Sequence, residues 1–280
     1  MTGPLRSAEL QLRAARRILP RAPLTRRRFG ALDDRFVFVV GSPRSGTTFL
    51  GRSIGSLPGF IDLGEVAPFK AAIPELAGLD ARDASPRLRR VLTRARRLGL
   101  VGGLRPLEQT PETAFVLAAA LEAFPAARVV HALRDGRDVA SSLLERGWLR
   151  AGRGGGDDAG LPFGPGARFW VEPEREEEFA GVSDARRAAW AWRRYVGAVR
   201  SAPVPVVEVR YEQLAGDPGA VAAQLASALD VPEGPLAEAL HQAHGASVGR
   251  HARDLESQDR ADVLQEAGDL LRELGYLQSV

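Results

Sequence analysis

The sequence has no cysteine, four histidines and a single lysine. Without cysteine the chain can form no disulfide bond, no thiolate nucleophile and no zinc–thiolate site. The histidines do not follow the His-Glu-x-x-His spacing of a metal site, so we predict no bound metal. Nearly all the positive charge is therefore arginine, whose planar guanidinium group suits phosphate and sulfate.

Long apolar runs are also absent. No stretch of about 18 apolar residues occurs, and the N-terminus lacks the apolar core of a signal peptide. These absences predict a soluble, cytoplasmic protein with no transmembrane segment. The formal net charge of +3 over 280 residues is too small for a chain that coats nucleic acid, so we predict no nucleic-acid partner.

Arginines are concentrated in residues 1–34, where they include Arg13, Arg16, Arg17, Arg21 and the run Arg26, Arg27 and Arg28. We interpret this segment as a basic N-terminal arm that is solvated and partly helical; a contact with a membrane or a polyanion is the alternative. Residues 35–280 are then predicted to form a single domain, as the length and the 45% hydrophobic content allow.

Short apolar segments alternate with segments of helical periodicity. Strands are predicted at 35–40, 127–133 and 204–209, and helices at 47–57, 85–99, 111–124, 183–200, 219–230 and 257–274. This alternation predicts an α/β fold, a P-loop-like three-layer arrangement with a central parallel sheet flanked by helices. The glycine-rich segment 150–168 is predicted to be a loop, which either covers a site or is a plain surface excursion.

The segment from Gly41 to Thr48 follows a predicted buried strand and opens a helix. In that position a glycine-containing loop directs backbone N–H groups and the positive end of the helix dipole at an anion. A nucleotide triphosphatase has lysine after the second glycine, but this chain has Thr47 there and supplies its cation earlier, as Arg44. Such a loop suits one phosphate that bears a transferable group, without Mg²⁺ between phosphates.

The segment Pro43-Arg44-Ser45-Gly46-Thr47-Thr48 resembles the 5′-phosphosulfate-binding loop of the sulfotransferase superfamily. A second motif of that family, a strand that ends in arginine with a serine eight residues later, is matched by Arg134 and Ser142. The resemblance implies a fold that binds 3′-phosphoadenylyl sulfate (PAPS) as co-substrate. It implies that the loop residues Arg44, Ser45, Gly46, Thr47 and Thr48 bind the donor, and that Arg134 and Ser142 hold its 3′-phosphate.

Further matches are similar to the tyrosylprotein sulfotransferase-like branch. Arg146 stands where that branch has another donor-binding arginine, and Tyr211 matches its tyrosine near the nucleotide. Ser247 and Arg250 belong to a segment that resembles the one closing over the 3′-phosphate. The resemblance thus adds Arg146, Tyr211, Ser247 and Arg250 to the predicted donor site.

The activity that this resemblance implies is in-line transfer of a sulfuryl group to an acceptor hydroxyl, with Arg44 and Glu65 as catalytic residues. Glu65 is our candidate for the general base, because a carboxylate near apolar neighbours can have a raised pKa. A plain acidic residue at a helix N-terminus is the alternative for Glu65. His131 is a rival base, although its place inside a buried strand is more typical of a core histidine.

Two departures from the family bear on activity and acceptor. Gln109 stands where the family commonly has lysine, and glutamine cannot cancel charge. The arginine pair with which the tyrosylprotein branch holds acidic peptides is replaced by Val66-Ala67-Pro68-Phe69, so we predict a small-molecule or carbohydrate acceptor. The aromatic residues Trp190 and Trp192, with Phe169 and Trp170 before them, either line its pocket or, as we favour, pack in the core. The alternative functions are a P-loop kinase of a small metabolite and a non-catalytic nucleotide-binding module.

Overall fold

A five-stranded parallel sheet forms the centre of the computed structural model, which describes residues 4–20, 31–165 and 169–278. The strand order is β2-β3-β1-β4-β5, and each neighbouring pair is parallel. The strands are β1 (Val37–Val40), β2 (Phe60–Asp62), β3 (Arg105–Glu108), β4 (Arg128–Leu133) and β5 (Val207–Arg210). All five carboxyl ends therefore point to one edge of the sheet, the edge at which parallel α/β folds bind their ligands.

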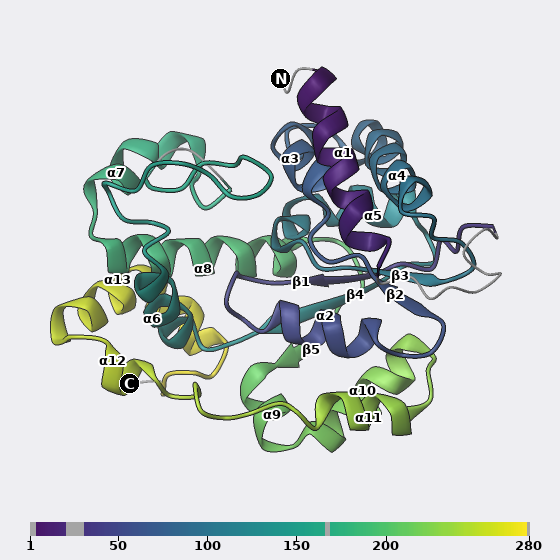
Figure 1. Ribbon diagram of the computed structural model, residues 1–280. Helices are drawn as coiled ribbons and strands as arrows, with labels where there is room; N and C mark the ends of the chain where they lie inside the picture. Colours follow the sequence, from purple (N-terminus) through teal and green to yellow (C-terminus); the bar gives the residue numbers. More distant parts are fainter. Residues whose placement is uncertain (1–3, 21–30, 166–168, 279–280) are drawn as a thin grey trace.

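Helices cover both faces of the sheet (Figure 1). On one face lie α2 (Thr47–Gly55), α9 (Tyr211–Gly216), α10 (Pro218–Leu229) and α11 (Glu233–Leu240). The other face and its edge carry α1 (Pro4–Ile18), α3 (Ala67–Leu76), α4 (Ala81–Leu98), α5 (Leu117–Ala123), α6 (Gly136–Arg146), α8 (Asp184–Ser201) and α13 (Ser257–Glu273). Shorter helices are α7 (Glu176–Gly181), α12 (His251–Asp254) and the 3-10 helices η2 (Pro111–Val116) and η3 (Pro173–Arg175).

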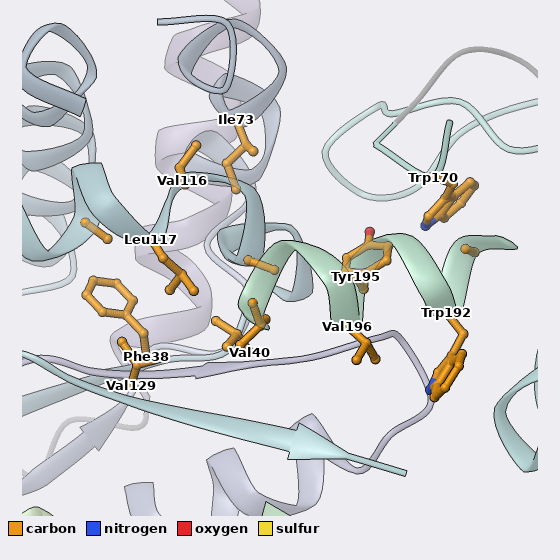
Figure 2. Packing of buried hydrophobic residues seen from close by; sticks show 14 of the residues in the cluster. Phe38, Val40, Ile73, Val116, Leu117, Val129, Trp170, Trp192, Tyr195 and Val196 are labelled. Carbon is orange, nitrogen blue, oxygen red and sulfur yellow. The ribbon is translucent and has the colours of Figure 1, made fainter. Parts of the chain in front are cut away.

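Side chains of β1 alternate between two hydrophobic clusters, as the period of a strand requires. Val37 and Val39 pack with α2 and α10, whereas Phe38 and Val40 pack with α5 and α8. Figure 2 shows Phe38 near Leu117 of α5, and Val196 on the side of α8 that faces the strands, whereas Tyr195 lies on the opposite side of that helix. A strand that is buried on both faces has apolar residues at every position, which explains its unbroken apolar run. The predicted three-layer fold is thereby confirmed.

The structure also has elements that the sequence analysis did not predict, among them β2, β3, α3 and α11. The strand β3 was not predicted, because Arg105-Pro106-Leu107-Glu108 has neither an apolar run nor regular alternation. This segment can lie inside the sheet because its buried charged groups have hydrogen-bond partners. Arg105, for example, donates to the carbonyls of Arg35 and Leu229. The helix predicted at 111–124 begins as the 3-10 helix η2 and becomes α-helical only at Leu117.

The expectation of a solvated N-terminal arm is wrong for α1. This helix packs on α3 and α4 and buries Leu10, Ala14 and Ile18, the last of them completely. Its arginines remain on the outer side, where Arg13 and Arg17 bind Asp158. Arg21, Arg26, Arg27 and Arg28 lie outside the described residues, and the division of the chain at residue 34 stays a prediction.

Trp190 and Trp192 are fully buried in the core, which confirms the interpretation we favoured. Trp192 donates from Nε1 to the carbonyl of Arg134 at 3.0 Å and packs under the first residue of α6, Gly136. A Cβ at Gly136 would lie 2.6 Å from Trp192 Cδ2, so the close approach of α8 to this junction requires glycine.

We therefore expect Gly136→Ala to lower the free energy of unfolding by about 1–3 kcal/mol, because the added methyl overpacks the core. Gly197→Ala on α8 is the matched control. A Cβ at that helical glycine meets nothing within 4 Å, and the change is expected to raise stability by about 0.5–1 kcal/mol. Urea unfolding of the two variants checks both values, and equal stability of Gly136→Ala and the wild type would contradict the first.

Candidate active site

The phosphate loop connects β1 to α2. Some of its residues have a positive φ, a backbone conformation that is strained for most residues with a side chain. Gly46, directly before α2, has φ 94°, and a Cβ there would lie 3.0 Å from Tyr211 Cδ2. Arg44 also has a positive φ, 76°, a conformation that is uncommon for a residue with a side chain and that occurs at ligand-binding loops. The free N–H groups at the start of α2 open toward the space above this loop.

A second strand-to-helix junction lies beside the first, because β4 pairs with β1 in parallel and Val40 is opposite His131. The two junctions are in direct contact: Arg44 Nε donates to Ser142 Oγ at 3.0 Å, and Arg134 Nη1 donates to the carbonyl of Arg44 at 3.2 Å. The loop and the Arg–Ser motif, 98 residues apart between Arg44 and Ser142, therefore form one continuous site.

Arg134 is buried at the end of β4 and held on several sides. Its guanidinium lies 4.5 Å from the ring centroid of Tyr211 and 3.6 Å from Asp138, and it donates to the carbonyl of Ser247. Tyr211 in turn shares a hydrogen bond of 3.1 Å with Ser247 Oγ. The structure thus brings the predicted donor residues Arg134, Tyr211 and Ser247 together around the junction.

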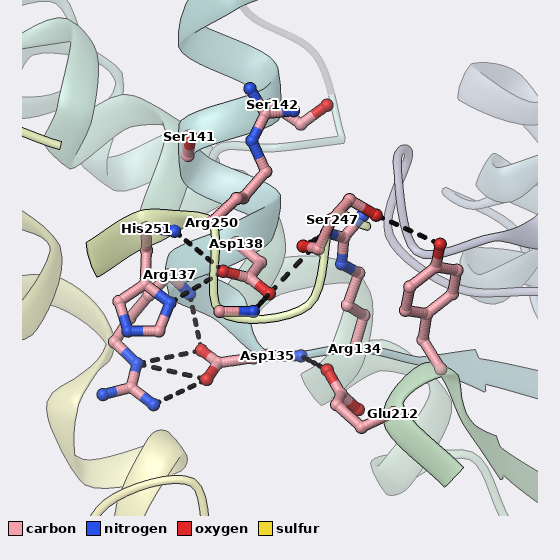
Figure 3. A network of polar contacts seen from close by, with 12 residues as sticks. Arg134, Asp135, Arg137, Asp138, Ser141, Ser142, Glu212, Ser247, Arg250 and His251 are labelled. Atoms are coloured by element: carbon pink, nitrogen blue, oxygen red, sulfur yellow. Dashed lines mark hydrogen bonds and ion pairs between the residues drawn. The ribbon is translucent and has the colours of Figure 1, made fainter. Parts of the chain in front are cut away.

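A segment from the C-terminal part of the chain covers the start of α6 (Figure 3). Asp138 accepts hydrogen bonds from the backbone N–H groups of Gly249 and His251, at 2.8 and 3.0 Å, and from His251 Nδ1 at 2.7 Å. Arg250 binds Asp254 at 2.7 Å and Glu145 at 3.0 Å. Burial alone would raise the pKa of Asp138, but the hydrogen bonds from His251 and Gly249 lower it below its ordinary value.

A cavity of about 490 Å³ opens next to the phosphate loop. Arg44, Thr47, Thr48 and Glu65 are all among the residues that line it. Arg146 does not line this cavity; it lies at the end of α6, and its positive charge adds to the effect of burial in lowering the pKa of Arg44. The cavity thus adjoins both the phosphate loop and the candidate base.

Glu65 lies between β2 and α3, two residues before the helix begins. Its carboxylate points into the cavity and Oε2 accepts from Lys70 Nζ at 2.7 Å, while no side chain caps α3 at Val66. Burial raises the pKa of Glu65 above its ordinary value, although the neighbouring Lys70 acts in the opposite direction. This geometry favours a carboxylate available to a ligand over an acidic residue that only stabilises a helix terminus.

Lys70 is a residue of this cavity that the sequence analysis did not assign. It lies on α3, is 7% exposed, and reaches Glu65, Glu112 and Asp157. The available signal was its uniqueness, since it is the one lysine in a chain rich in arginine.

His131 and Gln109 occupy different surroundings. His131 is 1% exposed inside β4 and is not among the residues that line the cavity; burial lowers its pKa to about 4. Gln109 follows β3 and does line the cavity, with its side chain filling the space above Gly51, where a Cβ would lie 2.1 Å from Gln109 Oε1. The position that we compared with a lysine is therefore at the site, and it is neutral.

The glycine-rich segment covers the site up to residue 165. Asp157, Asp158 and Phe163 all line the cavity, together with Trp148 just before the segment and Trp170 just after it. Asp157 Oδ1 accepts from the backbone N–H groups of Ala159 and Leu161, which holds the loop in a compact turn. Of the two interpretations, a loop over a site is the one that the structure supports.

Glu108, at the end of β3, supports the loops around the site from below. Its completely buried carboxylate accepts from the N–H of Thr110 at 2.9 Å and from the hydroxyls of Thr110 and Thr113, and it lies 3.5 Å from the N–H of Val66, beside Glu65. Burial is the largest influence on this group and raises its pKa from 4.5 to about 7.

We expect this carboxyl to make stability depend on pH. Between pH 4.5 and about 7 the folded chain holds a proton on Glu108 that the unfolded chain has released, so its contribution to stability falls as the pH rises. Glu108→Gln removes the titration and keeps an acceptor for Thr110 and a donor for Thr113. The variant should gain about 3 kcal/mol relative to the wild type across this window, as measured by urea unfolding at several pH values. A difference that stays constant with pH would contradict the prediction.

Within the described ranges, no helix is long and apolar enough to cross a membrane. No group of three or more histidine, aspartate or glutamate side chains in those same ranges is arranged to hold a metal ion. The predictions of a cytoplasmic location and of metal-free chemistry stay predictions.

We compared the chain with models of protein families and with curated protein sequences. The model of the sulfotransferase family matches residues 84–235, which include Arg134 and Ser142 and begin after the phosphate loop and Glu65. A search of curated protein sequences found no match.

Among solved structures, the chain is similar to the sulfotransferase domain of the olefin synthase from Synechococcus PCC 7002, at 14% identity and a TM-score of 0.52, over 86% of this chain and 95% of that one. It is also similar to sulfotransferase STF9 from Mycobacterium avium, at 14% identity and a TM-score of 0.49, over 95% and 82% of the two chains. Mouse SULT7A1, complexed with PAP, matches at 13% identity and a TM-score of 0.47, over 98% and 96%. Similarity at such low identities supports the fold alone. Of these three structures, we base the similarity of fold on the olefin synthase domain, whose TM-score is above 0.5.

Proposed function

Because this chain belongs to the sulfotransferase family, we propose that it transfers the sulfuryl group of PAPS to a hydroxyl of a small-molecule or carbohydrate acceptor. The observation that carries this proposal is the contact between the two strand-to-helix junctions, with Arg44 Nε 3.0 Å from Ser142 Oγ. Two anion-binding junctions in contact suit a nucleotide that carries an anionic group at each of two positions. The cavity beside them provides room for an acceptor.

The polar groups of the two junctions fit such a donor. Within the described part of the chain, the buried Ser45 Oγ and Arg134 Nε have no hydrogen-bond partner. Buried polar groups are almost always paired in folded proteins, so one group left over at each junction supports a ligand there. In this proposal Ser45, Gly46, Thr47 and Thr48 bind the 5′ end of the donor, and Arg134 and Ser142 bind its 3′-phosphate. Arg146, Tyr211, Ser247 and Arg250 support the second end.

The donor itself supplies the transferable sulfuryl group and a phosphate leaving group. Arg44 and the N-terminus of α2 stabilise negative charge that grows on the departing oxygen, an effect that is large when the donors are already in place. Glu65 accepts the proton of the acceptor hydroxyl, for which a raised pKa is suitable. Both residues line the same cavity, as the proposed in-line reaction requires.

The lining of the cavity supports the proposed acceptor class. Trp148, Phe163 and Trp170 offer apolar faces on which a sugar or a phenolic ring can pack. Lys70 and Arg17 of the same lining are already paired with Glu112, Asp157 and Asp158, which disfavours their use to bind an acidic peptide. A neutral ring compound with a hydroxyl is therefore favoured.

A labelled-donor assay tests the proposal against its two alternatives. The protein is incubated with ³⁵S-labelled PAPS or with γ-³²P-labelled ATP and Mg²⁺, each with a panel of sugars, phenols and an acidic tyrosine peptide. We expect label only from PAPS, on a sugar or phenol. Phosphorylated product would establish the kinase alternative, and tight binding of adenosine 3′,5′-bisphosphate with no transfer to the panel or to a cell extract would favour the non-catalytic module.

A further inference from the structure

Lys70 is the only lysine of the chain, and α3 carries it into the interior. Its neighbours Phe69 and Ile73 anchor the helix in the core, which leaves the Lys70 ammonium at the wall of the cavity with 7% of the residue exposed. A charge in such a place is costly unless it is paired. The pairing that Lys70 makes therefore determines what it can do.

Three carboxylates from three separate parts of the chain surround the Lys70 ammonium. Nζ lies 2.7 Å from Glu65 Oε2, 3.0 Å from Asp157 Oδ2 and 3.7 Å from Glu112 Oε2. Glu65 precedes α3, Glu112 lies in η2 after β3, and Asp157 belongs to the glycine-rich loop. One ammonium thus joins the candidate base, the end of the sheet and the loop that covers the site.

The charges around Glu65 show why this ammonium matters. Burial, Glu112 and Asp158 each disfavour the ionised form of Glu65, while Lys70 favours it through both its charge and its hydrogen bond. Arg17 and Arg44 also line the cavity, but Arg17 binds Asp158 and Arg44 binds Ser142. Gln109 lines it as well and is neutral. Within the described residues, Lys70 is therefore the cation in contact with Glu65.

We propose that Lys70 is a positioning residue of the transfer reaction, holding Glu65 ionised and oriented toward the acceptor and fastening the glycine-rich loop through Asp157. This inference rests on the proposed function, in which Glu65 is the general base. The choice of lysine in a chain that otherwise has arginine follows from shape. A compact ammonium can lie close to Glu65 at 2.7 Å and Asp157 at 3.0 Å in different directions and still attract Glu112 at 3.7 Å, whereas the planar guanidinium suits one or two acceptors in its plane.

The uniqueness of Lys70 allows a direct test of its contacts. Protein labelled with ¹⁵N only in lysine should give a single Nζ signal by NMR, from Lys70. We expect Glu65→Gln to shift this signal, and the matched control Glu75→Gln, whose exposed partner is Arg87 at 2.7 Å, to leave it unchanged. An unchanged signal in Glu65→Gln would overturn the proposal, whether or not the protein transfers sulfate.

The functional test compares Lys70→Met with Lys70→Arg. In protein labelled with ¹³C in the glutamate carboxyl groups, Lys70→Met should raise the pKa of Glu65 by about one unit or more, because an adjacent opposite charge is lost. The lower limb of the pH profile of kcat/KM, measured with the best acceptor of the panel, should move up by the same amount. Lys70→Arg should keep the pKa near that of the wild type and lose part of the rate.

Two measurements keep these outcomes separate. Arg87→Met, which removes a cation from an exposed ion pair, serves as the control and should change neither quantity. Thermal unfolding shows whether Lys70→Met, which leaves Glu112 and Asp157 without their lysine, is folded; if it is not, Lys70→Arg and the lysine NMR test decide. A folded Lys70→Met variant with an unchanged Glu65 pKa would overturn the proposal. If Glu65→Gln shifts the Lys70 signal but the wild-type protein never transfers a sulfuryl group, the proposed function is refuted and the contact between Lys70 and Glu65 stands.

Discussion

Glu65→Gln is expected to lower the rate of sulfuryl transfer by about 10²–10⁴-fold, the range typical of losing a general base. Glutamine keeps the size of the side chain and an acceptor for Lys70, but it cannot take a proton from the acceptor hydroxyl. Affinity for adenosine 3′,5′-bisphosphate should stay within about twofold of the wild type, because in the proposed reaction Glu65 contacts the acceptor hydroxyl and neither phosphate of this ligand. Transfer from labelled PAPS and calorimetric titration with the bisphosphate measure the two effects.

The pH dependence of the wild type adds a second check on the same residue. A general base works in its deprotonated form, and burial raises the pKa of Glu65 above its ordinary value. The rate should therefore increase with pH through a pKa above 4.5 and then level off, and this lower limb should be missing from the residual activity of Glu65→Gln. Glu75→Gln serves as the control with full activity. A variant at Glu65 that retains the wild-type rate and pH profile would remove Glu65 from the mechanism.

Arg134→Met is expected to weaken the binding of adenosine 3′,5′-bisphosphate by about 10²–10³-fold, since a buried charged hydrogen bond to an anion costs about 2–5 kcal/mol when one partner is truncated. Adenosine 5′-phosphate, which lacks the 3′-phosphate, should bind the variant and the wild type within a few-fold of each other. The difference between the two ligands separates loss of one phosphate contact from general damage to the site. Calorimetry with both nucleotides provides the measurement.

Arg128→Met is the matched control for that experiment. Arg128 begins the same strand, but its side chain is exposed at the opposite end of β4 and donates only to the carbonyl of Ala127 among the described residues. Its replacement should leave both affinities unchanged. If Arg134→Met weakened both nucleotides equally, Arg134 would not be the 3′-phosphate ligand, and its contacts with Arg44 and Ser247 would be its main role.

Much of the fold could be predicted because its signals are local. The apolar run of β1, the loop from Gly41 to Thr48 and the helical spacing that follows lie within about 20 consecutive residues, and each reflects a backbone requirement of that segment alone. The strand β3 carries no such signal. Its segment Arg105-Pro106-Leu107-Glu108 becomes a strand through pairing on both sides and through distant partners for its buried charges.

The candidate site divides in the same way. The strand–loop–helix context was enough to select Arg44, and the resemblance to the sulfotransferase superfamily selected Arg134 and Ser142 from their spacing after a strand end. Spacing did not indicate that Arg44 would bind Ser142, or that α1 would pack on the core and place Arg17 at the cavity. Both depend on how elements far apart in the sequence pack together.

The amino-acid sequence by itself determined the class of fold, the phosphate loop and the two junctions that it predicts for a doubly anionic nucleotide, because these follow from periodicity and motif within short segments. Only the tertiary structure decided which charges meet. Lys70 has no motif around it, and its partners Glu65, Glu112 and Asp157 are spread over some ninety residues; they come together because parallel strands bring their carboxyl ends, and the loops that follow, to one edge of the sheet.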